Sequence, residues 1–209
     1  MVRIFLTGDS HIPKRASSVP NEVYDEINKL IFSERFDYSF FTGDLIEAPK
    51  LMDFLNNITK KKVFKVIGNM DYYGGNKNLP LSQNLFVPIN EAEDISIGLF
   101  HGHQVHPRGD HSQLEAIAFE NNYNILVSGH THKEEVYLTR NGILLLNPGS
   151  ITGAWSFVAT GNYSFIVLNI DEFSKLIGVN LFQYQRKSTH FFITEHSFQW
   201  IDKSIKKRK

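Results

Sequence analysis

The 209-residue sequence contains no cysteine. Disulfide bonds, thiolate metal sites and cysteine nucleophiles are therefore excluded, and any metal ion must be held by His, Asp, Glu or Asn. Long hydrophobic runs are also missing, since no stretch approaches the roughly 18 apolar residues that a membrane span requires. The first residues, MVRIFLTGDS, show no signal-peptide pattern. These absences predict a soluble, cytoplasmic protein that does not insert directly into a membrane.

The chain also has no excess of either charge, because 22 Lys and Arg residues balance 22 Asp and Glu residues. No overall electric field would attract nucleic acid or an anionic membrane, so nucleic acid is not expected as a partner. The apolar fraction of 42% is that of a packed globular protein. We expect one domain over residues 1–186 and a C-terminal extension with a basic tail over residues 187–209.

Apolar runs and helical spacings alternate in the first part of the chain, and strands dominate the second part. The predicted strands cover residues 2–7, 38–44, 63–69, 85–89, 95–100, 124–128, 134–138, 143–147, 163–170 and 176–185, and the predicted helices cover 20–33, 47–58 and 112–121. A βαβαβ start followed by consecutive strands indicates an α/β fold. The expected architecture is a four-layer sandwich of two packed mixed β-sheets flanked by helices.

The C-terminal extension carries several aromatic residues between polar ones, among them Phe191, Phe198 and Trp200. They suggest either a further strand or a patch that packs on the domain or on a second subunit, so a homo-oligomer is one possible assembly. The last residues, IDKSIKKRK from position 201, are interpreted as a solvated or disordered end.

Polar residues follow the first three predicted strands at the point where each strand ends. Asp9 and His11 follow the first strand, and Asp44 and Asn69 each come directly after a Gly that closes an apolar strand. Each of these positions alone could be a turn. Because neighbouring parallel strands end at one edge of a sheet, where α/β proteins place ligands, three such endings favour a binding site.

Histidines follow later strands in the same way. His101 comes after ISIGLF, and His130 and His132 form a second pair spaced by two residues in SGHTH. Neutral imidazoles and carboxylates suit transition metals such as Mn, Ni, Fe, Co or Zn. A carboxylate such as Asp44 can bridge two cations roughly 3.5 to 4 Å apart, the spacing of two-metal hydrolases. The predicted ligands are Asp9, His11, Asp44, Asn69, His101, His130 and His132.

The order GDSH, GDL, GNMD, HGH and GHTH resembles the signature of the calcineurin-like metallophosphoesterase superfamily over roughly residues 2–170. NPGS at 147–150 and the small size resemble the branch that contains YfcE-like bacterial phosphodiesterases, their archaeal relatives and the small retromer subunit of eukaryotes (vacuolar protein sorting protein 29). Local segments such as HGHQVHPRGD resemble the retromer subunit and its archaeal relatives more than the bacterial enzymes. The resemblance implies the two-sheet sandwich inferred above.

The resemblance also implies roles for the seven ligands and a reaction. Asp9, His11 and His132 would hold one metal ion, Asn69, His101 and His130 would hold the other, and Asp44 would bridge the two. A hydroxide between the ions would attack the phosphorus of a small phosphoester, expected to be a phosphodiester, so no Ser or Cys nucleophile is needed. Asp44 and Asn69 are accordingly among the predicted catalytic residues.

The sequence departs from many phosphatase relatives after the GN asparagine, where Met70 replaces a histidine that can protonate the leaving group. Met cannot donate a proton, so we assign this role to His103, which is equally explained as a loop histidine beside the site. Arg108 is predicted to orient the substrate phosphate. The alternative function is a weakly catalytic or non-catalytic, retromer-like scaffold that binds a helical-repeat protein.

Overall fold

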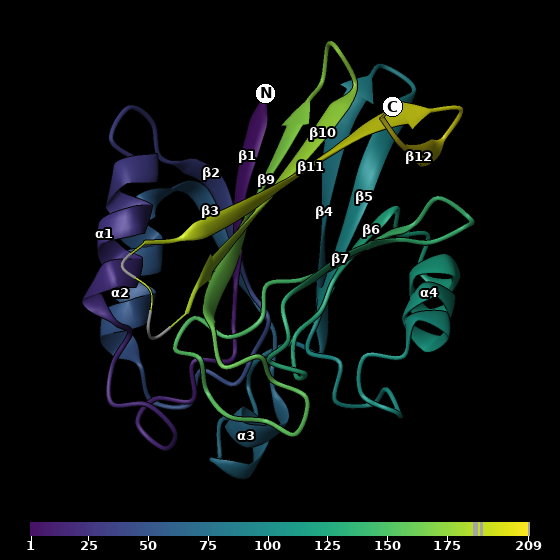
Figure 1. The fold of residues 1–209 in the computed structure, drawn as a ribbon. Coiled ribbons are helices and arrows are strands. Elements are labelled where there is room, and N and C mark those ends of the chain that lie inside the picture. The colour runs from purple at the N-terminus through teal and green to yellow at the C-terminus, as the bar shows by residue number, and fades with distance from the viewer. Residues whose placement is uncertain (186–187, 189, 209) are drawn as a thin grey trace.

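Two β-sheets packed face to face form the centre of the chain in a computed structural model, which describes residues 1–185, 188 and 190–208 (Figure 1). The elements follow in the order β1 (Val2–Thr7), α1 (Asn21–Leu30), β2 (Phe36–Phe41), α2 (Pro49–Ile58), β3 (Thr59–Lys65), α3 (Asn69–Tyr73), β4 (Ser82–Asn90), β5 (Glu93–Phe100), α4 (His111–Glu120), β6 (Ile125–Val127), β7 (Glu135–Leu138), β8 (Leu144–Asn147), β9 (Tyr163–Asp171), β10 (Leu176–Tyr184), β11 (Phe192–Ile201) and β12 (Ser204–Lys207).

Both sheets mix parallel and antiparallel neighbours. The seven-stranded sheet has the order β12-β11-β10-β9-β1-β2-β3, in which β1, β2 and β3 run parallel and β9 runs antiparallel to β1. The five-stranded sheet has the order β4-β5-β6-β8-β7, in which β5, β6 and β8 run parallel. Parallel strands of one sheet end at the same edge. Hydrogen bonds of His130 with Asp9 and of His101 with Thr42 join the loops after β6 and β5 to the loops after β1 and β2.

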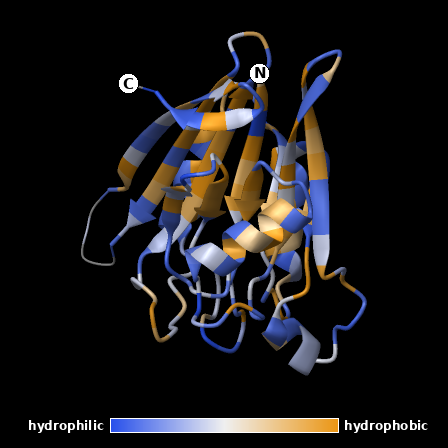
Figure 2. Ribbon diagram, turned by 90° about the vertical axis from the view of Figure 1, so that its right-hand side faces the viewer, coloured by the Kyte–Doolittle hydropathy of each residue, from blue (hydrophilic) through white to orange (hydrophobic). Residues whose placement is uncertain are grey.

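Three apolar clusters hold the layers together. The central cluster fills the space between the sheets and includes Ile4 and Leu6 of β1 together with Ile97 and Leu99 of β5. A second cluster joins the seven-stranded sheet to α1 and α2, and a third joins the five-stranded sheet to α4. Figure 1 shows these helices on opposite outer sides, and Figure 2 shows the hydrophobic residues concentrated on the strands. The predicted four-layer α/β sandwich is confirmed.

The covering helices begin where the sequence supplies start signals. Pro20 precedes α1, and Pro49 is the first residue of α2, where the missing N–H of proline leaves no hydrogen bond unmade. Asp110 caps α4, because its Oδ1 accepts a hydrogen bond from the backbone N–H of Gln113 at 2.9 Å. Across the residues that the structure describes, none of the helices combines the length and apolar content needed to cross a lipid bilayer.

Two segments differ from the prediction. β3 ends at Lys65, and Asn69 begins the short helix α3 instead of ending a strand. The basic tail, interpreted as a solvated or disordered end, instead forms β12, which pairs with β11 and buries Ile205 in the central cluster. β11 itself pairs with β10, so the C-terminal aromatic residues continue the seven-stranded sheet. The predicted domain boundary at 186 and 187 lies outside the described residues.

Candidate metal centre

The predicted ligands lie at one end of the two sheets, in the segments that follow β1, β2, β3, β5 and β6. Asp9 and His11 follow β1, Asp44 follows β2, and Asn69 is the first residue of α3 after β3. His101 follows β5, and His130 and His132 follow β6. These loops and α3 gather at the bottom of Figure 1. The site is therefore assembled across both sheets.

Most of the predicted ligands have a left-handed backbone that side chains rarely adopt. The φ angles are 48° at Asp9, 49° at His11, 56° at Asp44, 68° at His130 and 58° at His132. Such conformations are energetically unfavourable for residues other than glycine and persist where the surrounding structure enforces them. The fold thus tolerates strain at the positions that direct these side chains toward one another.

Four of these side chains form one buried cluster, in which a potential ligand atom of each lies within 4.8 Å of the others: Asp9, His11, Asp44 and His132. The Nε2 atoms of His11 and His132 are 3.0 Å apart. Asp9 Oδ1 lies 3.4 Å from His132 Nε2, and Asp44 Oδ2 lies 3.3 Å from His11 Nε2. Ligand atoms that share one ion at bond lengths of about 2.0–2.2 Å are roughly 3 Å or slightly more apart, so these separations fit a cation.

The remaining predicted ligands form a second group, which also reaches Asp44. His101 Nε2 is 3.5 Å from Asp44 Oδ2 and 3.1 Å from Asn69 Oδ1. The ring of His130 is 5.1 Å from that of His101, centroid to centroid. Its backbone N–H donates to Asp9 Oδ2 at 3.0 Å, which links the two groups. The structure therefore brings all seven residues together, and the Asp44 carboxylate lies within 3.5 Å of a histidine from each group.

Backbone carbonyls orient two of the imidazoles. His101 Nδ1 lies 2.8 Å from the carbonyl oxygen of Thr42, and His132 Nδ1 lies 2.8 Å from that of Ala154. A carbonyl can only accept, so each Nδ1 carries the hydrogen and each Nε2 is directed at the cluster. Metal-binding histidines in proteins are commonly oriented by such a contact.

Asp71 is a residue that the sequence analysis did not identify. Its Oδ2 accepts hydrogen bonds from the backbone N–H groups of Asp44 and Gly68, and its Oδ1 accepts one from Ile46, all between 2.8 and 2.9 Å. This buried carboxylate thereby connects the loop after β2 to the start of α3. The signal available in the sequence was an acidic residue two positions after Asn69, next to a predicted site.

Two glycines allow the loops to approach the carboxylates closely. A methyl group on Gly68 would overlap the Asp44 side chain, and one on Gly129 would overlap Asp9 Oδ2 and Thr42. Because nearby backbone and carboxylate atoms occupy that space, any larger residue would displace the candidate ligands.

The two carboxylates have pKa values shifted in opposite directions. Burial would raise the pKa of Asp9, but the charges of His132, His101 and His11 lower it to about 2. Burial raises the pKa of Asp44 to about 6; the negative charge of Asp9 adds to this effect, and His101 opposes it. Asp9 is therefore ionised at neutral pH, whereas Asp44 retains a proton in mildly acidic solution.

The pKa values of the imidazoles are also shifted in opposite directions. Burial lowers the pKa of His11 and that of His130 to about 3, so both are neutral with a lone pair available at pH 7. For His132 burial acts in the same direction, but the Asp9 carboxylate and the Ala154 carbonyl outweigh it and raise the pKa above 6.5. His132 therefore holds a proton more readily than His11, and the Nε2 atoms of the two rings lie 3.0 Å apart.

The donor set fits a transition-metal ion. Asp9 Oδ1 is buried without a hydrogen-bond partner, which normally destabilises a folded protein. A cation between this oxygen and the surrounding imidazoles would satisfy it, and mixed nitrogen and oxygen donors are those that divalent transition metals prefer. The buried Asp and His cluster could therefore hold a metal ion.

The two residues predicted to act on the substrate lie at the edge of the cluster. The ring of His103 is 5.6 Å from that of His101, and burial lowers its pKa. The exposed guanidinium of Arg108 lies over the ring of Phe157, 5.7 Å from its centroid, and its charge contributes to the lowered pKa of His130. Met70 uses its backbone N–H to bind Asp44 Oδ1 at 2.7 Å.

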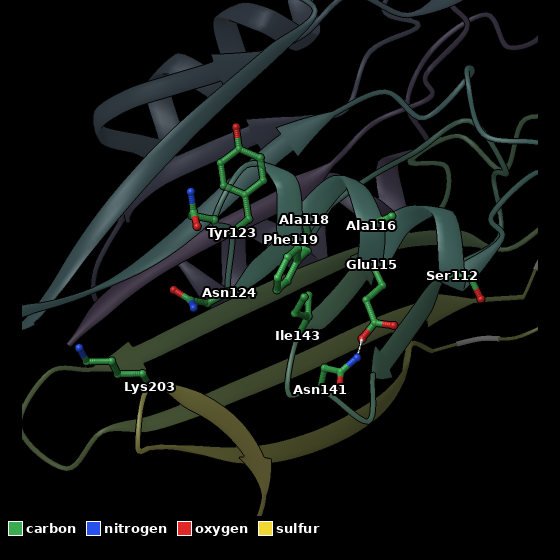
Figure 3. Close-up of a pocket in the computed structure, with 11 residues that line it drawn as sticks. Ser112, Glu115, Ala116, Ala118, Phe119, Tyr123, Asn124, Asn141, Ile143 and Lys203 are labelled. Atoms are coloured by element: carbon green, nitrogen blue, oxygen red, sulfur yellow. Dashed lines mark hydrogen bonds between the residues drawn. The ribbon is translucent and has the colours of Figure 1, made fainter.

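The cavity of about 630 Å³ beside α4 contains none of the predicted site residues. Figure 3 shows it bordered by Glu115, Phe119, Asn141 and Lys203, with Glu115 accepting a hydrogen bond from Asn141 at 3.1 Å. The candidate centre is instead a buried cluster whose neighbouring cavity, of about 270 Å³, lies between Asn69 and His103.

The sequence model of the calcineurin-like phosphoesterase superfamily domain matches residues 2–172. The chain belongs to this superfamily. It is 38% identical over 149 residues to the probable metallophosphoesterase MJ0623 of Methanocaldococcus jannaschii, covering 71% of this chain and 68% of that protein. The predicted family is confirmed, and this likeness supports a phosphoester hydrolase.

Solved structures of vacuolar protein sorting 29 (Vps29) from Entamoeba histolytica share the superfamily fold. A single mutant of that protein is 27% identical to this chain, with a TM-score of 0.80. The match covers 95% of this chain and 100% of that chain. The wild-type protein complexed with Zn²⁺ is 26% identical, with a TM-score of 0.76 and coverage of 94% and 99%. The expected similarity to the small retromer subunit is therefore also confirmed.

Proposed function

We propose that this superfamily member is a metal-dependent phosphodiesterase that uses two divalent ions held by the seven clustered residues. The observation that carries the proposal is the position of Asp44, whose Oδ2 lies 3.3 Å from His11 Nε2 and 3.5 Å from His101 Nε2. A single carboxylate oxygen between two groups of donors is the arrangement that a bridging ligand requires. Asp9, His11 and His132 would hold one ion, and Asn69, His101 and His130 the other.

When bound, the two ions supply an activated water and neutralise the charge that develops on the phosphoryl oxygens. The chain contributes the geometry. The carbonyls of Thr42 and Ala154 fix the ring orientations of His101 and His132, and Asp71 holds the Asp44 loop against Asn69. Mn, Ni, Fe, Co and Zn all suit this donor set, and zinc is the ion in the complex of Entamoeba histolytica Vps29.

His103 and Arg108 are proposed to act on the substrate. His103 is neutral at pH 7, because burial and the nearby His101 lower its pKa, so it can donate one ring N–H to a leaving oxygen but is not a strong acid. Arg108 is exposed near His130, where its guanidinium can bind a phosphoryl oxygen.

A diester substrate is favoured by the residue after Asn69. Met70 cannot protonate a leaving group, and its backbone N–H is already bonded to Asp44. The better substrate for this site is therefore an ester whose leaving group departs with little protonation, such as an aryl oxide.

Protein loaded with Mn²⁺ or Ni²⁺ should hydrolyse bis(p-nitrophenyl) phosphate, and Asp44→Asn should lose most of that activity. Wild-type protein that loads metal but turns over no phosphoester in a broad panel would contradict the proposal.

A scaffold function is the second candidate, because the chain and Vps29 share nearly their full lengths at a TM-score of 0.80. The partly buried Ile12 and the exposed Pro13 and Pro107 would supply an apolar rim for a helical partner near the centre. Capture of a stoichiometric helical-repeat protein from native extract, combined with no phosphoester turnover by the metal-loaded chain, would favour this function over catalysis.

A further inference from the structure

A cavity of about 270 Å³ lies directly beside the candidate metal centre, and none of the functions above uses it. Its lining residues are Ile67, Gly68, Asn69, Tyr72, Tyr73 and Leu81, together with His103. Asn69 and His103 are the lining residues that belong to the candidate site. The cavity therefore opens where the organic group of a bound phosphoester would extend.

The outer walls of this cavity are apolar and exposed. Tyr73 and Leu81 are 78% and 73% exposed, and Tyr72 is 50% exposed. Exposed apolar residues that occur singly need no explanation, but three around one cavity at a candidate active site mark a binding surface. These side chains contribute little to the cores between the layers, so stability does not account for their position.

The arrangement of the rings favours a planar aromatic ligand over an aliphatic chain. The rings of Tyr72 and Tyr73 meet edge to face, with centroids 6.1 Å apart and planes at 80°. Aromatic rings attract further rings in stacked or edge-to-face geometry. Lys77 Nζ lies 4.8 Å from the centroid of the Tyr72 ring, a contact that keeps a cation beside the ring. The polar hydroxyl ends of Tyr72 and Tyr73 suit a ligand ring that stays partly in water.

Helix α3 fixes the distance between the candidate centre and the aromatic wall that Tyr72 and Tyr73 form. Asn69 begins the helix and Tyr72 and Tyr73 end it, with the N–H of Tyr72 donating to the Gly68 carbonyl at 3.1 Å. Asp71, in the middle of the same helix, binds the Asp44 backbone. A rigid element thus carries both a proposed ligand and the aromatic wall.

We infer that the cavity between α3, Leu81 and His103 is a subsite for the planar aromatic group of a phosphoester, such as an aryl group or a nucleobase. The inference rests on the proposed function and narrows its substrate class from phosphodiesters in general to those with an aromatic substituent. The phosphoryl group would occupy the centre, and the ring would lie against Tyr73 and Leu81.

Calorimetric titration of the Mn²⁺-loaded protein with phenylphosphonate and methylphosphonate tests this inference. The two anions share the phosphonate group, differ in the organic group and contain no ester bond to hydrolyse. Burial of one ring against aromatic and aliphatic walls is expected to make phenylphosphonate bind about tenfold more tightly. In the double variant Tyr73→Ala, Leu81→Ala the two affinities should agree within about threefold.

Phe119→Ala is the matched control, because Phe119 is 76% exposed and borders the separate cavity beside α4. It should keep the wild-type preference. Equal binding of the two phosphonates by the wild type, a preference that survives in the double variant, or no binding of either anion would overturn the subsite. Failure of the proposed function has a different signature, in which phenylphosphonate binds preferentially but no phosphodiester is hydrolysed.

Discussion

The Nε2 atoms of His11 and His132 lie 3.0 Å apart, and the Asp9 carboxylate is 3.4 Å from the second of them. Two imidazole nitrogens can be this close only with a proton or a cation between them. The pKa of His11 is lowered to about 3 and that of His132 is raised, so a proton at this contact is held by His132 in preference to His11. A metal ion bound between these two nitrogens would compete with such a proton.

Metal affinity is accordingly expected to fall in mild acid. His132 has a raised pKa and Asp44 has a pKa of about 6, so the protonated fraction of each group rises as the pH falls and decreases as the pH rises. The apparent affinity for Mn²⁺ at pH 5 should be at least about tenfold weaker than at pH 7.5, because Asp44 alone is then mostly protonated. Calorimetry at both pH values measures this difference, and equal affinities would show that neither group competes with the metal.

Asp71 is predicted to position the centre without touching metal or substrate. In Asp71→Asn one oxygen is replaced by an NH₂ group that faces backbone N–H donors, so the Asp44 loop should shift. Metal affinity and kcat/KM for bis(p-nitrophenyl) phosphate should each fall by about 10- to 100-fold.

The control for Asp71 is Asp25→Asn, on the exposed side of α1. It should leave both quantities unchanged. If Asp71→Asn lowered the melting temperature but left metal affinity intact, the residue would have a structural role alone.

Gly68→Ala should damage the centre more than the fold. Its methyl group would overlap the Asp44 side chain and the backbone N of the same residue. Displacement of Asp44 by even 1 Å should lower kcat by about 100-fold. The matched variant Gly178→Ala, where a methyl group would meet only Asn169 Cβ at 3.9 Å, should retain activity. Equal activities in the two variants would contradict the close approach of Gly68 to Asp44.

The last strand should contribute measurably to stability. Ile205 of β12 is 1% exposed and packs in the central cluster, so Ile205→Ala should lower the free energy of unfolding by about 2–5 kcal/mol. Ile201→Ala removes the same atoms at a site that is 39% exposed and should have a clearly smaller effect. Urea denaturation measures both, and similar losses would mean that β12 does not hold Ile205 in the core.

The sequence allowed the layers and the location of the centre to be predicted, because both depend on local patterns. Apolar runs that end in Gly and a polar residue marked the strand ends after β1 and β2, and those strands are parallel neighbours. The left-handed backbone at His11 and Asp44 was not predictable, since neither residue type specifies that conformation. Contacts between distant loops enforce it.

Two other features depend on tertiary contacts in the same way. Asp71 acquires its role only when the loop after β2 lies against α3, a contact between residues 27 positions apart in the sequence. The charge run around Lys206 and Lys207 suggested a solvated tail, whereas pairing with β11 turns Ile205 inward. A single buried apolar residue among lysines is too weak a periodic signal to predict a strand.

Hydrolysis of bis(p-nitrophenyl) phosphate as a function of added Mn²⁺ tests the central claim most directly, with the metal bound per chain counted in the same samples. If Asp9, His11 and His132 hold one ion, Asn69, His101 and His130 hold another and Asp44 bridges them, activity should reach its plateau at two bound ions per chain, and Asp44→Asn should remain near background. A plateau at one ion, or a chain that binds two ions without turnover, would contradict the two-metal phosphodiesterase.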